Sequence, residues 1–241
     1  MQPIKTTGLV IRAIQVGDYN KMLTVLTSDL GKISVWAKGV RSVKNPLMPL
    51  CSVLCYSEML LNKKGDAYTL TGGSVQESFY HLRDDVKKLA CGIYFADIAG
   101  SVCEEGMPAD EVLRLTLNSL HYLEKNKKSI EELKCMFELR LMSEAGLMPR
   151  LTECVLCGKD ECDRFDPESG GAVCRECAPA GALHITPDAL KRAEHYVAGG
   201  LKHAFDTEAG HYLKELGDIS EEYVKFHLGR KIKTLEYLKM L

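Results

Sequence analysis

The sequence lacks any apolar run long enough to cross a membrane. A membrane-spanning helix needs about 18 or more consecutive apolar residues. The most apolar stretch, residues 47–61, is interrupted by proline, serine and glutamate. The first residues, MQPIKTT, also lack the apolar segment of a secretory signal. We therefore expect a soluble, cytoplasmic protein with no membrane association.

Signatures of common enzyme classes are missing as well. There is no GxxxxGK[ST] phosphate loop, no GxGxxG, no GxSxG and no HExxH. The seven histidines are dispersed, and adjacent acids such as Asp84 and Asp85 diverge on a helix rather than sharing a substrate. The sequence therefore predicts no catalytic residues and a protein that is not an enzyme. An enzyme with dispersed catalytic groups remains an alternative.

Net charge is small but unevenly divided along the chain. The formal charge of the whole chain is −2. Residues 1–64 carry nine Lys or Arg against three Asp or Glu, a formal charge of +6, and the remainder carries −8. This asymmetry favours a basic module that binds a polyanion, joined to an acidic body. A solvated surface with some excess of cations would give the same count.

Four of the ten cysteines have the spacing of a metal site. Because no secretory signal is evident, we expect reduced thiols rather than disulfides. The pattern C-x2-C-x16-C-x2-C predicts two tight turns that point four thiolates at one ion, through Cys154, Cys157, Cys174 and Cys177. Four thiolates leave no open position for water, so the expected cofactor is one structural zinc ion. Cys162 lies between the pairs and is either a substitute ligand or a bystander.

The first 75 residues have the pattern of a small all-β domain. Short apolar or alternating runs predict strands at 7–14, 22–27, 32–38, 53–61 and 67–70. Gly31 is placed to take the left-handed position in the turn between the second and third runs. Five short strands without helical periodicity between them predict a small closed barrel.

After the barrel the apolar period becomes helical. The pattern predicts a long helix at 76–104, a second helix ending near residue 126, and a third that begins with a capping box at Ser129 and Glu132. Thr186 and Pro187 open a short helix, and residues 220–241 form a final one. The expected fold is α+β, with a barrel at 1–75, helices at 76–149, a zinc ribbon at 150–180 and further helices at 181–241.

The barrel carries the candidate nucleic-acid residues. Cations follow the third strand and its loop, and others extend along the barrel; the candidate DNA-binding residues are Arg12, Lys21, Lys32, Trp36, Lys38, Arg41 and Lys44. A flexible basic loop, freed by Gly39, with aromatic side chains nearby is typical of single-strand binders. Tyr19 and Trp36 are the aromatic candidates, although Trp36 is equally compatible with a core position.

These segments, in this order, resemble the bacterial recombination mediator family RecO over essentially the whole chain. The likeness rests on the cysteine pairs and on TGLVIR at 7–12, LTSDLGK at 26–32, AKGVR at 37–41 and FDPESGGAVC at 165–174. The resemblance implies an N-terminal OB-fold, a helical body and a four-cysteine zinc module. It also implies binding of single- and double-stranded DNA, strand annealing, and help to RecA in replacing the single-strand-binding protein SSB.

The same resemblance implies the partners RecR and the C-terminal tail of SSB, a functional link to RecA, and a location in the bacterial cytoplasm with the nucleoid.

If about four phosphates are neutralised on a single strand, the log–log salt slope of binding would be near −3. The alternative is a non-catalytic adaptor whose zinc ribbon and helical body dock protein partners. DNA binding separates the two hypotheses.

Overall fold

In the computed structural model, which describes residues 3–65 and 67–241, the chain forms two compact units. The first unit comprises Met1–Glu124 and Thr234–Leu241, and the second comprises Lys125–Lys233. Residues 1 and 2, part of the stretch without a secretory signal, lie outside the described residues, as does residue 66. Among the described helices, none is both long and apolar enough to span a membrane.

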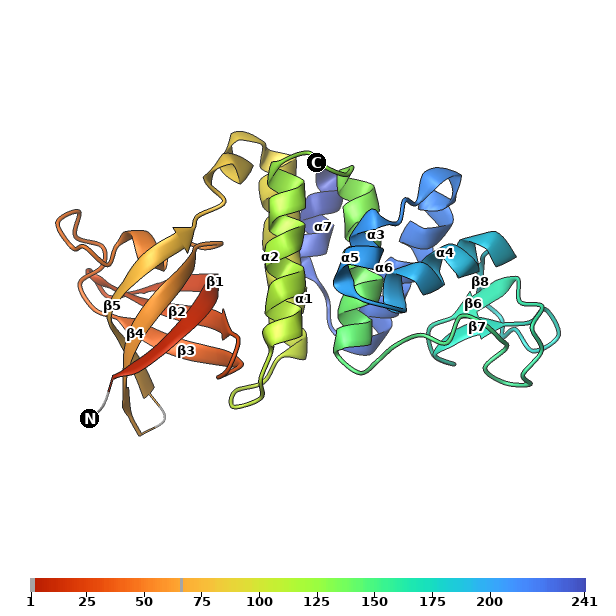
Figure 1. Cartoon of the computed structure of the whole chain (residues 1–241), viewed down its shortest axis with the longest axis horizontal. Helices are drawn as coiled ribbons and strands as arrows, with labels where there is room; N and C mark the ends of the chain where they lie inside the picture. The colour runs from red at the N-terminus through yellow and green to blue at the C-terminus, as the bar shows by residue number, and fades with distance from the viewer. Residues whose placement is uncertain (1–2, 66) are drawn as a thin grey trace. The chain divides into compact units, whose positions relative to one another are not determined.

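Five strands of the first unit close into a barrel (Figure 1). They are β1 (Ile4–Val16), β2 (Asn20–Thr27), β3 (Lys32–Ala37), β4 (Tyr56–Lys64) and β5 (Ala67–Glu77). Neighbours follow the order β1-β2-β3-β5-β4, and β1 pairs with β4 to complete the barrel. The β3–β5 pair is parallel and the others are antiparallel. This arrangement is an OB-type barrel, which confirms the expected β domain.

Strand alternation fills the interior of the barrel. Inward residues face one another across neighbouring strands, as Leu23 does with Val35 and Val25 with Ile33. These four side chains are at most 1 % exposed. Burial of each such aliphatic side chain contributes about 1.5–3 kcal/mol. The barrel is therefore held together by its apolar interior, and the side chains on its outer face are left for contacts with other elements or with ligands.

The helix expected at 76–104 begins ten residues later than predicted. Strand β5 continues to Glu77, a 3-10 turn spans Tyr80–Asp84, and helix α1 runs over Val86–Val102. The carboxylate of Asp85 caps α1 by accepting hydrogen bonds from the backbone N–H groups of Lys87 (2.9 Å) and Lys88 (3.1 Å). The predicted start was wrong because two buried residues three positions apart belong to a 3-10 turn and its cap: Phe79 is the N-cap residue and Leu82 lies within the turn. That turn produces the same spacing of apolar residues as an α-helix.

The β2–β3 turn docks on the loop between α1 and α2 (Asp110–Glu124). Gly31 has a φ of +68°, which confirms its predicted left-handed conformation. Backbone hydrogen bonds join the two segments, from Lys32 N to Glu104 O (3.2 Å) and from Gly106 N to Leu30 O (2.9 Å). In the same unit, helix α7 (Lys233–Met240) is tied to α1 by a 2.6 Å hydrogen bond from Thr234 Oγ1 to Asp97 Oδ2.

The second unit contains helices α3 (Ile130–Glu144), α4 (Pro187–Val197), α5 (Leu201–Asp206) and α6 (Leu213–Leu228). Ser129 caps α3 and Thr186 caps α4, so both predicted starts are confirmed. The final helix predicted at 220–241 is wrong, because Gly229 takes a left-handed conformation (φ +58°) and ends α6. A separate helix, α7, follows.

Helices α3 and α6 are joined by buried polar contacts. Ser220 Oγ donates to the fully buried carboxylate of Glu138 (2.6 Å), and the Lys134 ammonium pairs with Glu138 at 2.8 Å. A short three-stranded sheet with the four cysteines completes the second unit. The predicted α+β class, a five-stranded barrel followed by helices and a cysteine cluster, is thereby confirmed.

Candidate metal centre and nucleic-acid interface

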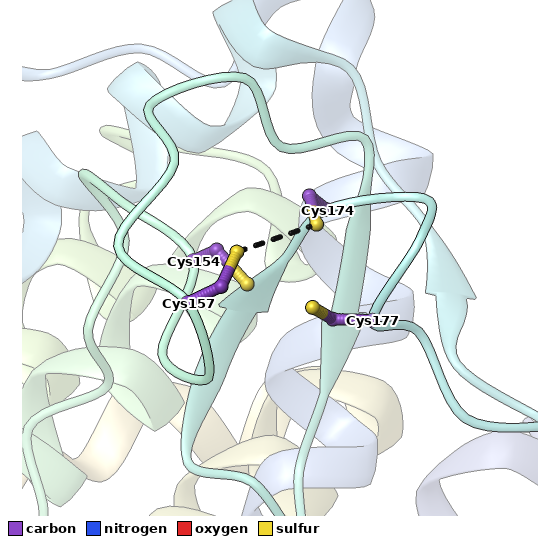
Figure 2. A group of neighbouring side chains, drawn as sticks. All are labelled: Cys154, Cys157, Cys174 and Cys177. Carbon is purple, nitrogen blue, oxygen red and sulfur yellow. Dashed lines mark hydrogen bonds between the residues drawn. The ribbon is translucent and has the colours of Figure 1, made fainter.

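The four predicted cysteine ligands lie together at one end of the small sheet (Figure 2). The sulfur atoms of Cys154, Cys157, Cys174 and Cys177 all lie within 4.8 Å of one another. The Cys157 and Cys174 sulfurs are 3.7 Å apart. Four thiolates in a tetrahedron about an ion, with bonds of about 2.3 Å, would be separated by about 3.8 Å. The four residues therefore fit a tetrahedral metal ion.

Local backbone structure brings the two cysteine pairs together. Strands β6 (Arg164–Asp166) and β7 (Gly171–Val173) form the hairpin between the pairs, and β8 (Leu183–His184) adds to β6. The first pair is folded into a tight turn by a 2.8 Å hydrogen bond from Gly158 N to Cys154 O. In the second pair, Cys177 N donates to Cys174 O at 3.1 Å. Each C-x-x-C pair thus forms the turn that its spacing predicts.

The electrostatics of the cluster favour a bound cation. Burial raises the pKa of Cys154, but backbone N–H groups of Cys174, Leu156 and Cys157 stabilise its thiolate and bring the pKa to about 6. Hydrogen bonds with Cys174 and Cys157 raise the pKa of Cys177 to about 12. Four thiolates cannot share this volume without a positive charge between them.

Cys162 is separate from this group. Its side chain is buried, its sulfur lies 3.6 Å from the carbonyl oxygen of Lys159, and it is not among the cysteines that converge. Burial raises the pKa of Cys162 to about 11. Of the two readings of Cys162, the structure agrees with the bystander.

The ribbon is anchored to the helices of its own unit. The ring of Phe165, on β6, packs edge-on against Tyr223 on α6, with centroids 5.5 Å apart. The Tyr223 hydroxyl donates to the carbonyl oxygen of Leu147 at 3.1 Å. The segment that carries the four cysteines is therefore attached to α6 through β6.

On the barrel, three candidate cations have free side chains. Arg12 lies on the outer face of β1, Lys38 follows the end of β3, and Lys44 lies in the loop beyond. All three are exposed, and none forms a side-chain hydrogen bond or ion pair within the described parts of the chain. Uncompensated cations on an exposed strand and loop are suited to a polyanionic ligand.

The other three candidate cations bond to backbone carbonyls. Lys21 pairs with the buried Ala37 in the strand register, and its ammonium donates a hydrogen bond to Cys51 O at 3.3 Å. Lys32 donates to Gly100 O on α1 at 2.6 Å, and Arg41 donates to Asp18 O at 2.8 Å. These three cations hold segments of the first unit together.

Trp36 lies in an apolar stripe on the outer face of the barrel. The strand register places it next to Met22, which in turn pairs with Ile14. Ile14 is 45 % exposed, while Trp36 and Met22 are partly exposed. Trp36 is therefore not a residue of the barrel interior. Its neighbours Ile14 and Met22 were not predicted, although strand alternation places them on the same face once the strands are paired through their turns.

Two amides that were not predicted from the sequence, Asn20 and Asn45, shape the basic loop (residues 38–44). Asn20 Oδ1 accepts from the backbone N–H of Gly39 at 2.9 Å, and Asn45 Nδ2 donates to the carbonyl oxygen of Lys38 at 3.2 Å. No motif signals such contacts, because each joins residues that are distant in the sequence or depends on the loop conformation. Gly39 predicted a flexible loop. The structure instead joins the loop to the β1–β2 turn and the start of β2 by hydrogen bonds.

Known proteins match the chain over both units. The family models described as the recombination protein O N terminus and C terminus match residues 1–79 and 83–236. The DNA repair protein RecO of Acetivibrio thermocellus is 35 % identical, with 100 % of this chain and 98 % of the relative covered. Its namesake from Alkaliphilus metalliredigens is 33 % identical, with 99 % of both chains covered. Full-length similarity, the barrel and the cysteine ribbon together place the chain in the RecO family of DNA repair proteins.

Proposed function

We propose that this protein is a non-catalytic recombination mediator. It binds single- and double-stranded DNA without sequence preference, anneals complementary strands and assists in loading RecA onto strands coated with SSB. The observation that carries this proposal is the set of free cations, Arg12, Lys38 and Lys44, on the barrel that also exposes Trp36. Membership of a DNA repair family agrees with such a surface.

The proposed mechanism is electrostatic. Cations that contact phosphates release condensed counterions, and the resulting entropy gain drives binding that is independent of sequence. Annealing requires two strands near one protein with their mutual repulsion reduced, which a cationic surface provides without a nucleophile or general base. In this proposal Arg12, Lys38 and Lys44 contact phosphates and Trp36 contacts bases, while Lys21, Lys32 and Arg41 add charge and hold the surface in shape.

The proposed ion in the cysteine cluster is a single zinc with a structural role. Zinc prefers tetrahedral thiolate sites, and four thiolates leave no position for a reacting water. Cys154, Cys157, Cys174 and Cys177 would hold it, and its chemistry there is to neutralise the four thiolates. A ribbon of about 30 residues is too small to fold on an apolar core alone, so metal binding contributes directly to its folding.

The proposed partners are RecR, the C-terminal tail of SSB and, functionally, RecA, and the proposed location is the cytoplasm in association with the nucleoid. These proposals rest on the family, because the relatives named above are DNA repair proteins. The protein-interaction adaptor remains the competing hypothesis, because it would use the same helices and ribbon without DNA.

The test is DNA binding by a charge-reversed barrel. Lys38→Glu with Lys44→Glu should weaken binding of labelled single- and double-stranded DNA in fluorescence anisotropy. On single strands the log–log salt slope should become shallower by about 1.4, at roughly 0.7 for each lost phosphate contact. The matched control is Lys202→Glu with Lys214→Glu, two exposed lysines of the second unit whose side chains have no partner among the described residues.

Two results would decide against the proposal. If the wild-type protein binds neither form of DNA, the adaptor hypothesis is favoured. If the Lys38 and Lys44 changes alter affinity no more than the control changes, the barrel is not the DNA-binding surface.

A further inference from the structure

The turn between β1 and β2 presents an aromatic side chain beside the basic loop. Tyr19 is 65 % exposed, and it follows Gly17, whose φ of +60° makes the tight turn possible. An exposed aromatic ring on a turn is a large apolar surface that the fold itself does not use. The ring is therefore available to a ligand.

The turn and the loop are fixed to each other by hydrogen bonds. The backbone N–H of Arg41 donates to Tyr19 O at 3.1 Å, and its guanidinium donates to Asp18 O at 2.8 Å. Asn20 Oδ1 holds the backbone N–H of Gly39 at 2.9 Å. Contacts on both sides of Tyr19 thus hold its backbone in place. A ring on an immobilised backbone loses little conformational entropy when it binds.

Charges and apolar groups are combined in this one place. Lys38 and Lys44 are cations in the loop with no side-chain partner in the part of the chain that the structure describes, and Val43, between Arg41 and Lys44, is 87 % exposed. Cations beside an exposed ring and an exposed aliphatic group match the chemistry of an unpaired nucleotide, with its anionic phosphate and its flat base. In a duplex the base faces are covered by neighbouring bases, so only the phosphates would find partners here.

We infer that Tyr19 is a specificity-determining residue that stacks on unpaired bases, and that Arg41 is the positioning residue that fixes its turn. This inference rests on the proposed DNA binding and deepens it. It names single strands, or the unpaired segments of partly annealed strands, as the preferred ligand of this edge of the barrel. Lys38 and Lys44 then serve both forms of DNA, whereas Tyr19 serves single strands alone.

The test compares single- and double-stranded DNA of equal length in fluorescence anisotropy. Tyr19→Ala should lower affinity for single strands about 5- to 150-fold, the range for loss of one stacked base. Affinity for duplex and the salt slope should not change, because no cation is removed. Tyr19→Phe keeps the ring and should retain single-strand affinity. Tyr237→Ala, a change at a 53 % exposed tyrosine on α7, is the control.

Arg41→Lys tests the positioning role separately. Lysine keeps the charge, but its side chain is shorter and lacks the planar guanidinium whose Nη1 donates to both Asp18 O and Gly17 O, so these contacts should weaken. The variant should lose part of the single-strand preference while the salt slope stays at the wild-type value. If it instead retains the full preference, Arg41 does not position Tyr19.

The outcomes separate this inference from the proposed function. If Tyr19→Ala binds single strands like wild type, or loses single-strand and duplex affinity equally, the stacking role is refuted while DNA binding stands. If wild type binds no DNA, both fall. Unchanged urea midpoints, followed through Trp36 fluorescence, would show that each variant is folded; should Tyr19→Ala be unfolded, Tyr19→Leu provides the same comparison.

Discussion

Replacement of Gly31 by alanine should destabilise the first unit far more than an ordinary glycine change. A Cβ at this position would lie 2.0 Å from Glu104 O and 2.5 Å from Met107 O, both backbone atoms of the α1–α2 loop. Backbone oxygens cannot move away alone, so the β2–β3 turn and this loop must separate. The left-handed conformation of Gly31 adds a second penalty for any residue with a Cβ.

The magnitude follows from these two effects. The left-handed conformation costs an alanine about 1–2 kcal/mol. Separation of the segments weakens the hydrogen bonds from Lys32 N to Glu104 O and from Gly106 N to Leu30 O, each with a net value of about 0.5–1.5 kcal/mol. We therefore expect Gly31→Ala to lower the free energy of unfolding of the first unit by about 2–5 kcal/mol. This is a large part of the total for most domains.

The assay is urea unfolding followed by tryptophan fluorescence. Trp36 is the single tryptophan of the chain and lies on β3, so its emission reports on the barrel alone. With a urea dependence of about 1–3 kcal/mol per M, the midpoint should fall by about 1 M or more. Gly106→Ala is the matched control, because Gly106 lies in the same docking loop with a φ of +79° and has nothing within 4 Å of a new Cβ. If both variants unfold at the same urea concentration, the steric argument is wrong.

Two further predictions concern the second unit. Cys174→Ser should reduce bound zinc from one equivalent to a small fraction, by atomic absorption, and make the ribbon sensitive to protease, whereas Cys162→Ser should keep the metal because Cys162 lies outside the cluster. Full metal retention in Cys174→Ser would contradict the assigned ligands. Burial lowers the pKa of His227 below 6.5, so the unfolded chain takes up the proton more readily and stability should fall as pH drops from about 7 to 5. His227→Gln should flatten that dependence in circular dichroism melts made at equal metal content; parallel profiles for the two proteins would show that His227 has no part in it.

The sequence predicted those features that depend on local spacing. The C-x-x-C pairs define their own turns, strand alternation defines the barrel interior, and Gly31 defines a turn that only glycine adopts without strain. The predicted helix boundaries were wrong where two different structures give the same spacing of apolar residues. The residues before α1 form a 3-10 turn with helix-like periodicity, and a single glycine, Gly229, divides an otherwise continuous helical pattern into α6 and α7.

The candidate DNA site shows a different limit, because charge counts do not report what a cation does in the fold. Three of the candidate cations donate to backbone carbonyls, which the sequence did not indicate: Lys21, Lys32 and Arg41. Two uncharged residues, Asn20 and Asn45, shape the loop. This difference is measurable. If only the three free cations contact a single strand, the salt slope of binding should be near −2; contact by all six candidate cations would give about −4. A slope of about −4 would mean that Lys21, Lys32 and Arg41 also neutralise phosphates, through the N–H donors that their carbonyl partners leave unused.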